Sequence, residues 1–291
     1  MDTTVFRVAM GAAGSTTVPG QQAFTVPGTY SLTVARDTYL LSVVLIGGAS
    51  AATVPFSTTE FGLGGNGGSL RWIKDLPVTP GEVLTVVVGK GGAPGISGES
   101  SFLKRGTLNL LVAAGGNRTD STPFGPGPYG GVVGGGNGGP GGILGSHQNG
   151  PRGGGGGGAG GYSGDGGKGA SAPSTYATNG SGGGGGGGGW GGQGAGASGG
   201  GGVGLLGEGV SGVGNDVSGG TGGSGGAAGS SATYSGAYNT SGVGGTYGGA
   251  SGGAGSPVTM NYASVGPSSG GAGRVIWGPG RSYPSTRTAD E

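Results

Sequence analysis

The sequence predicts an all-β base, either a small sandwich or a barrel, that carries a glycine-rich bundle of polyglycine II helices, with essentially no α-helix. Three observations lead to this fold class. Short apolar, β-branched runs separated by Pro/Gly turns fill the first 114 residues. Glycine accounts for 89 of the 291 residues, where an average protein has about 7 %. No segment shows the 3.6-residue apolar period of an amphipathic helix.

Residues 1–114 form the predicted base domain. In the stretch FTVPGTYSLTVA, residues Tyr30, Leu32 and Val34 alternate with Ser31 and Thr33, which is the pattern of a half-buried strand. The run YLLSVVLIGG is continuously apolar and suits a central strand. The further strands expected are GSLRWIKDL, VLTVVVG and LNLLVAAGG, separated by the turn sequences PVTPGE and KGGAPGISGES.

The C-terminal segment returns to a β-like composition. Residues 274–285 are expected to complete the base, with Arg274–Trp277 as a strand of the N-terminal sheet, and 286–291 are expected to be a tail. The glycine-rich region, residues 115–273, would then be one large insertion whose two ends leave the same sheet.

The glycine region raises the question of how it can fold. A chain without large side chains has no apolar core, so its backbone groups must pair with one another. An α-helix is disfavoured because each glycine costs about 1 kcal/mol relative to alanine. Collagen needs a strict Gly-X-Y repeat with much proline, whereas one tract here is eight consecutive glycines, residues 182–189. Extended threefold helices that hydrogen-bond side by side remain, with glycine-poor segments as the loops between them.

The alternative is a disordered Gly/Ser linker. Only 9 % of the residues are charged and the formal net charge is +1, whereas disordered chains usually stay soluble through high net charge. A structureless connection of about 160 residues between two strands of one sheet would also be unusual. We therefore expect the region to be ordered.

The composition argues against several function classes. The near-zero net charge gives no electrostatic footprint for nucleic acid, and no apolar run is long enough to cross a bilayer. The chain has no cysteine and a single histidine, His147, which disfavours metal clusters and a Ser-His-Asp triad. Carboxylates are scattered, so paired acid–base chemistry is not expected. We expect no enzyme activity, no cofactor, no metal, no nucleic-acid partner and no membrane insertion.

Aromatic residues are the remaining candidates for function. Trp190 lies within a glycine tract, and we expect it to cover the edge of a rod. Four tyrosines instead lie in glycine-poor segments, where Tyr offers rigid, amphipathic contact area. The predicted recognition residues are Tyr176, Tyr234, Tyr238 and Tyr262, together with His147. If rods alternate in direction, successive segments fall at opposite ends, and only some of these residues can share one tip.

Both ends of the chain carry a family resemblance. The segments GQQAFTVPGTYSLTV, SVVLIGG, GGSLRWIKDLPVTPGEVLTVVVGKGG and RVIWGPGRSYPSTRTAD resemble the glycine-rich tail-fibre and adhesin-like proteins of tailed bacteriophages, cyanophages in particular. The resemblance implies a sandwich-like base from which glycine-rich segments emerge. It also relates the chain to the adhesins of T-even-type long tail fibres, in which polyglycine II helices carry receptor-binding loops. Unlike those adhesins, this chain has its own sandwich motifs at the N-terminus.

The resulting hypothesis is a non-enzymatic virion protein, located in a tail fibre or baseplate, whose tip loops bind a host-surface protein or polysaccharide. Its base would attach to another tail or baseplate protein, and self-association remains open. The alternative is a purely structural spacer or decoration protein without a receptor. A third class, an extracellular fibril or cell-wall protein, would require export and self-association.

Overall fold

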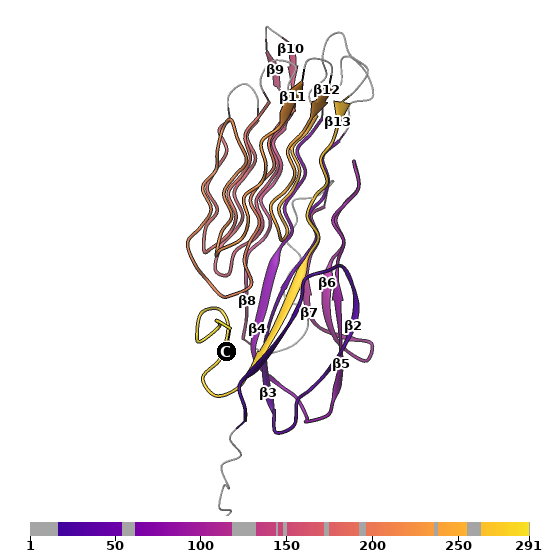
Figure 1. The fold of residues 1–291 in the computed structure, drawn as a ribbon, viewed down its shortest axis with the longest axis vertical. Coiled ribbons are helices and arrows are strands. Elements are labelled where there is room, and N and C mark those ends of the chain that lie inside the picture. The colour runs from indigo at the N-terminus through magenta and orange to yellow at the C-terminus, as the bar shows by residue number, and fades with distance from the viewer. Residues whose placement is uncertain are drawn as a thin grey trace, which may run out of the picture.

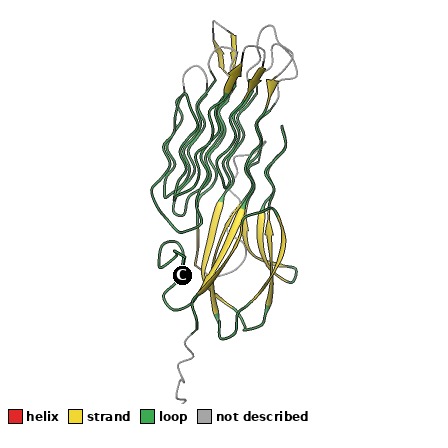
Figure 2. Ribbon diagram, viewed as in Figure 1, coloured by secondary structure: helices red, strands yellow, loops and turns green. Residues whose placement is uncertain are grey.

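Nine strands form a base, and glycine-rich segments rise from it as a bundle of extended rods (Figure 1). The structure is a computed structural model that describes residues 17–53, 62–117, 132–143, 145–147, 150–171, 175–191, 196–235, 238–254 and 263–290. The described residues contain strands, turns and extended backbone but no helix (Figure 2). The expected all-β fold without α-helix is therefore confirmed.

The first sheet of the base has five strands in the order β1-β14-β3-β4-β8, and every neighbouring pair is antiparallel. The strands are β1 (Gly20–Phe24), β3 (Leu40–Ile46), β4 (Leu70–Pro77), β8 (Val132–Gly134) and β14 (Ala272–Trp277). The C-terminal strand β14 lies between β1 and β3, with Val275 opposite Val43. The first and last strands of the chain, β1 and β14, are therefore paired in one sheet.

The second sheet has four antiparallel strands in the order β2-β5-β6-β7. They are β2 (Gly28–Thr33), β5 (Val83–Val88), β6 (Ser101–Arg105) and β7 (Leu108–Ala113). The alternation expected around β2 is observed, because Leu32 is buried while Ser31 and Thr33 are exposed. The two sheets enclose an apolar core that includes Val43, Ile73, Leu84, Leu103 and Leu111, as in a sandwich.

Three details of the base differ from the sequence-based expectation. The first predicted strand is two strands, because Thr25, Val26 and Pro27 separate β1 from β2, and these strands join different sheets. Strand β6 was not expected, since its sequence SFLKR has a weak apolar pattern. Strand β8 comes from the glycine-rich region and pairs with β4 over only three residues.

The glycine-rich segments form rods with a threefold hydrogen-bonding period. Along residues 153–161, every third N–H reaches the same neighbouring rod, at 2.9–3.1 Å: those of Gly154, Gly157 and Gly160 donate to the carbonyls of Gly62, Gly65 and Gly68. The intervening N–H groups donate to residues 164–170 and to residues 198–201. A repeat of three residues per turn, with every backbone hydrogen bond made to a neighbouring rod, is the geometry of the polyglycine II helix.

Rod 153–161 is surrounded on all sides. Its carbonyl oxygens accept hydrogen bonds from residues 136–142, 185–188 and 250–253, in addition to the three rods that it donates to. Six neighbours make a hexagonal lattice. The eight-glycine tract 182–189 occupies a similar interior position, with bonds to residues 156–159, 167–170, 198–201, 212–215 and 218–221. Buried backbone groups are thus paired without an apolar core.

The spacing between rods leaves no room for a side chain at many interior glycines. A Cβ atom on Gly157 would lie 1.9 Å from the Gly139 carbonyl oxygen, and one on Gly158 would lie 2.1 Å from that of Gly185. Contacts below 3.0 Å are essentially never made by real Cβ atoms. Only glycine therefore fits at these two positions, whereas Ala159 in the same rod is accommodated within the second apolar cluster.

The bundle starts earlier in the sequence than the predicted boundary at residue 115. Segments 47–53, 62–69 and 89–98, expected to be turns or strand ends of the base, are bonded into the rods. For example, the Gly64 N–H donates to Gly142 and the Gly65 N–H to Ser251. The physical reason is that a strand that ends in glycines can continue into a rod without a break, as β3 does at Gly47.

A second apolar cluster joins the base to the bundle. It brings the outer face of the five-stranded sheet, including Ile46, Trp72 and Ile276, against Tyr162 and Leu205 from the turns at the base end of the rods. The Trp72 indole N–H donates to the Tyr162 carbonyl at 2.7 Å.

The described part of the predicted tail, residues 286–290, packs against the bundle and the base. Thr288 is buried and donates through its hydroxyl to the Leu206 carbonyl at 2.6 Å. The buried Arg274 guanidinium donates to the Thr288 carbonyl and to the Asp290 carboxylate. The C-terminal segment therefore holds the base against the bundle as far as Asp290.

Candidate functional site

The end of the bundle opposite the base, called the distal end below, carries short strands instead of rods (Figure 1). They are β9 (Gly145–His147), β10 (Gly150–Arg152), β11 (Thr233–Ser235), β12 (Tyr238–Thr240) and β13 (Ala263–Ser264). Strands β9 and β10 pair with each other, and β12 lies between β11 and β13. At the base end, by contrast, successive rods are joined by tight turns such as residues 161–164 and 181–184.

The predicted recognition residues gather at the distal end as far as they are described. His147 lies in β9, and Tyr234 and Tyr238 lie in the β11–β12 hairpin, where Tyr238 is opposite Ser235. Tyr262 lies outside the described residues. The expected split between two ends does not occur among the described residues of this set, because pairs of rods separate the segments, as rods 153–161 and 164–170 separate β10 from Tyr176.

Tyr176 is also at the distal end. It follows a bridge between Ser171 and Thr175 that closes the turn after rod 164–170. Ala170, at the end of rod 164–170, accepts a hydrogen bond through its carbonyl from the Gly155 N–H. Gly155 lies near the start of rod 153–161, which follows the distal strand β10, so Ala170 is near the distal end as well. The Tyr176 side chain is 72 % exposed. Trp190, which follows the last glycine of its tract, is half-buried.

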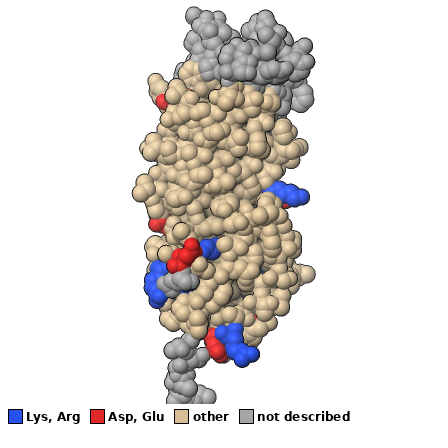
Figure 3. Space-filling view, in the orientation of Figure 1, with Lys and Arg blue, Asp and Glu red and all other residues tan. Residues whose placement is uncertain are grey.

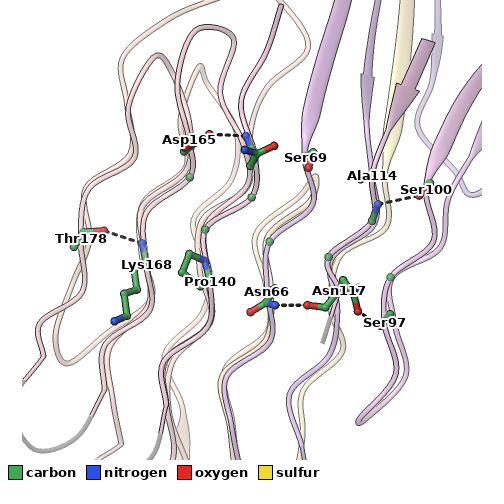
Figure 4. A pocket seen from close by; sticks show the side chains of 18 residues that line it. Asn66, Ser69, Ser97, Ser100, Ala114, Asn117, Pro140, Asp165, Lys168 and Thr178 are labelled. Atoms are coloured by element: carbon green, nitrogen blue, oxygen red, sulfur yellow. Dashed lines mark hydrogen bonds between the residues drawn. The ribbon is translucent and has the colours of Figure 1, made fainter. Parts of the chain in front are cut away.

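A second candidate site is a groove of about 630 Å³ on the side of the bundle, called the lateral face below (Figure 4). Its side chains form two rows that cross the rods. The row nearer the base contains Ser69, Ser100, Ala114 and Asp165, and Asn137 joins it through the hydrogen bond from its N–H to the Asp165 carboxylate. The row nearer the distal end contains Asn66, Ser97, Asn117, Pro140, Lys168 and Thr178.

The two rows follow from the threefold geometry of the rods. On each of five segments the two lining side chains are three residues apart, as in Asn137 and Pro140 or Asp165 and Lys168. One turn of a threefold helix brings both side chains to the same face, about 9 Å apart at 3.1 Å per residue. The spacing was visible in the tract GGGNGGPGGI, and a search for residues three apart within glycine tracts would have identified this face.

The polar side chains of the lateral face are fixed by neighbouring rods. The Asn66 Oδ1 atom accepts from the Gly141 N–H at 2.8 Å, and the Asp165 Oδ1 atom accepts from the Asn137 N–H at 2.7 Å. The Thr178 hydroxyl oxygen accepts from the Lys168 N–H at 2.7 Å. These side chains are therefore already ordered, which lowers the entropy cost of binding a ligand.

Arg71 supports the face from beneath. Its guanidinium is buried and donates to the Gly136 carbonyl at 2.6 Å and to the Asn137 Oδ1 atom. Burial lowers the pKa of Arg71, and the nearby Asp165 carboxylate opposes that shift. The Asn137 side chain is thereby held with its amide nitrogen available to act as a donor.

Charged residues are concentrated near the base in the view of Figure 3, and the surface of the bundle above them is almost free of charge. Among the described residues, no group of three or more His, Cys, Asp or Glu side chains is arranged to hold a metal ion. The described part of the chain also has no helix of the length and apolarity required to cross a membrane.

No protein-family model matches the chain, and a search of curated proteins gives no match.

Proposed function

We propose that this chain is a tail-fibre or baseplate adhesin of a tailed bacteriophage, a non-enzymatic virion protein that binds the host cell surface through its distal loops. The observation that carries the proposal is the separation of the two ends of the molecule. The base contains the first and last strands, β1 and β14, in one sheet, and glycine-poor segments that include Tyr176, Tyr234 and Tyr238 emerge at the opposite end.

The physical reason for assigning recognition to the loops is the chemistry of the rods. A rod in the interior has committed its N–H and C=O groups to neighbours, so it has little with which to distinguish partners. Tyrosine side chains dominate many binding hot spots, and truncation of one such residue costs about 2 kcal/mol or more. The base is left to attach to another tail or baseplate protein.

The alternative function is a structural spacer or decoration protein without a receptor. The length of the bundle favours this alternative, because a long rigid bundle can hold two partner proteins apart without binding a receptor. The proposal and the alternative differ in whether the isolated chain binds cells.

The test measures adherence of the labelled, purified chain to a panel of bacterial cells. Tyr176→Ala, and replacement of residues 233–240 by a Gly/Ser stretch of equal length, are expected to reduce adherence at least tenfold. Tyr39→Ala is the matched control, because Tyr39 is 61 % exposed but belongs to the base. The spacer function would be favoured if the chain adheres to no strain. It would also be favoured if the chain adheres to a strain and both changed chains adhere equally well.

A further inference from the structure

We propose that the lateral face is a second binding site, for a neutral polysaccharide laid across the rods. This inference extends the proposed adhesin function by naming a ligand class, but it concerns a different surface from the distal loops. It rests on the repeat, the charge and the unpaired backbone groups of the face.

The lining side chains recur from rod to rod, and this repeat suits a ligand that is itself a polymer of repeating units. Five adjacent segments each contribute side chains to the two rows, so a ligand that crosses the rods meets a new polar group at every rod (Figure 4). A small molecule would use only part of this array.

The charges at the face favour a neutral ligand. Among the described residues that line it, Asp165 and Lys168 alone have ionisable side chains, and their formal charges cancel. A nucleic acid would require several cations to neutralise its phosphates. A lipid or an apolar peptide side chain would require apolar walls, but the lining is formed mainly by glycine, serine and asparagine.

The face also offers backbone donors and acceptors. Residues Gly135, Gly138 and Gly141 share one side of their rod and are half-buried, whereas Gly136, Gly139 and Gly142 are buried. Within the described residues the Gly138 N–H and C=O have no hydrogen-bond partner, although the Gly139 N–H donates to Gly158. Gly138 lines the groove.

Hydroxyl groups match this mixture of donors and acceptors. Each sugar hydroxyl both donates and accepts, as the hydroxyls of Ser and Thr do. It can accept from the Asn137 amide, the Lys168 ammonium group or the Gly138 N–H, and donate to the Asp165 carboxylate or the Gly138 carbonyl. The ordered side chains make this array a preformed site.

The experiment uses the full chain on a printed array of neutral oligosaccharides, namely glucans, mannans, galactans and N-acetylglucosamine oligomers, with sulfated dextran as the polyanion. The strongest ligand is then titrated against three variants. Pro140→Trp places a ring over the groove without removing a hydrogen bond, because Pro140 is exposed and has no N–H. Lys168→Ala removes one donor. Val210→Trp is the matched control, since Val210 is 86 % exposed and lies outside the groove.

We expect wild type to bind a neutral glycan, Pro140→Trp to weaken binding at least tenfold, Lys168→Ala to weaken it several-fold, and Val210→Trp to change it less than twofold. Unfolding midpoints verify that the variants are folded. If Pro140→Trp does not fold, the result for Lys168→Ala alone decides the test. The inference fails if wild type binds no glycan, if it binds only sulfated dextran, or if the groove variants bind as wild type does. The two distal-loop variants of the adherence test are titrated in parallel. If only they lose binding, the proposed function is retained and the lateral site is rejected.

Discussion

The ring of Tyr162 stacks on the ring of Tyr283, with centroids 5.8 Å apart and planes inclined by 19°. Tyr162 belongs to a turn of the bundle, and Tyr283 belongs to the C-terminal segment that follows the base. Both side chains are fully buried. This pair therefore packs the C-terminal segment against a turn of the bundle, within the second apolar cluster.

The first prediction concerns this pair. Tyr283→Ala should lower the free energy of unfolding by about 3–5 kcal/mol, the usual cost of removing a large buried aromatic side chain. Tyr162→Phe should cost about 1–3 kcal/mol, because the hydroxyl donates to the Gly204 carbonyl at 3.0 Å and accepts from the Gly207 N–H at 3.2 Å. Chemical denaturation measures both values, and the exposed Tyr39→Phe serves as the control. Equal stability of all three variants would show that the junction contributes little.

The second prediction concerns pH. Burial raises the pKa of Tyr283 to about 12, although Arg274 opposes the shift; the unfolded value is about 10. A raised pKa in the folded state means that the stabilisation is complete below pH ~10 and is lost as the pH rises from about 10 to 12. Burial also raises the pKa of Tyr162, with the same sign. Stability measured across this range should fall less steeply in Tyr283→Phe than in wild type. Identical slopes would contradict the assignment.

The third prediction tests the packing of the rods. Gly157→Ala should destabilise the chain by about 1–3 kcal/mol or more, because its Cβ would lie 1.9 Å from a backbone oxygen that cannot move independently. Gly209→Ala is the matched control, since its nearest neighbour would be 3.2 Å away. Thermal unfolding of the two variants provides the comparison. If the interior variant were as stable as the control, the lattice would be looser than described.

The fourth prediction tests the closure of the base by the C-terminal strand. A chain that ends at Gly271 lacks β14, so β1 and β3 lose their shared partner. We expect the core residues of the base to lose protection from hydrogen exchange. A chain that ends at Trp277 keeps β14 but lacks the segment around Tyr283, and it should fold with reduced stability. Full protection of the base in the shorter chain would disprove the role of β14.

Much of the fold could be predicted from the sequence, because local patterns determine its elements. The alternation around Leu32 predicted β2, and the apolar run 40–46 predicted β3. The glycine tracts predicted rods, because an uninterrupted run of glycine disfavours both an α-helix and a collagen helix but allows extended rods to pair their backbone groups side by side. Strand β8 could not be predicted, because its sequence VVG depends on the neighbouring β4 for its pairing.

The candidate sites were less predictable. The loop tyrosines were proposed from composition, but the common distal location of Tyr176, Tyr234 and Tyr238 depends on how many rods separate the segments. The lateral face combines residues from 66 to 178 in the sequence, and only the lattice determines which of these segments become neighbours. Its local signal, polar residues three apart within glycine tracts, becomes informative once the threefold rod is established.

The hexagonal arrangement around rod 153–161 has a consequence for how such a molecule can change in size. A sandwich core encloses a fixed volume, whereas a lattice of glycine rods can be enlarged at its perimeter. A rod that runs towards the distal end, followed by one that returns, adds one complete loop at the tip and leaves both chain ends where they were. An outer pair could be gained or lost with its loop while the interior rods keep their hydrogen bonds. The number of loops displayed is therefore adjustable in single units, independently of the base that anchors them.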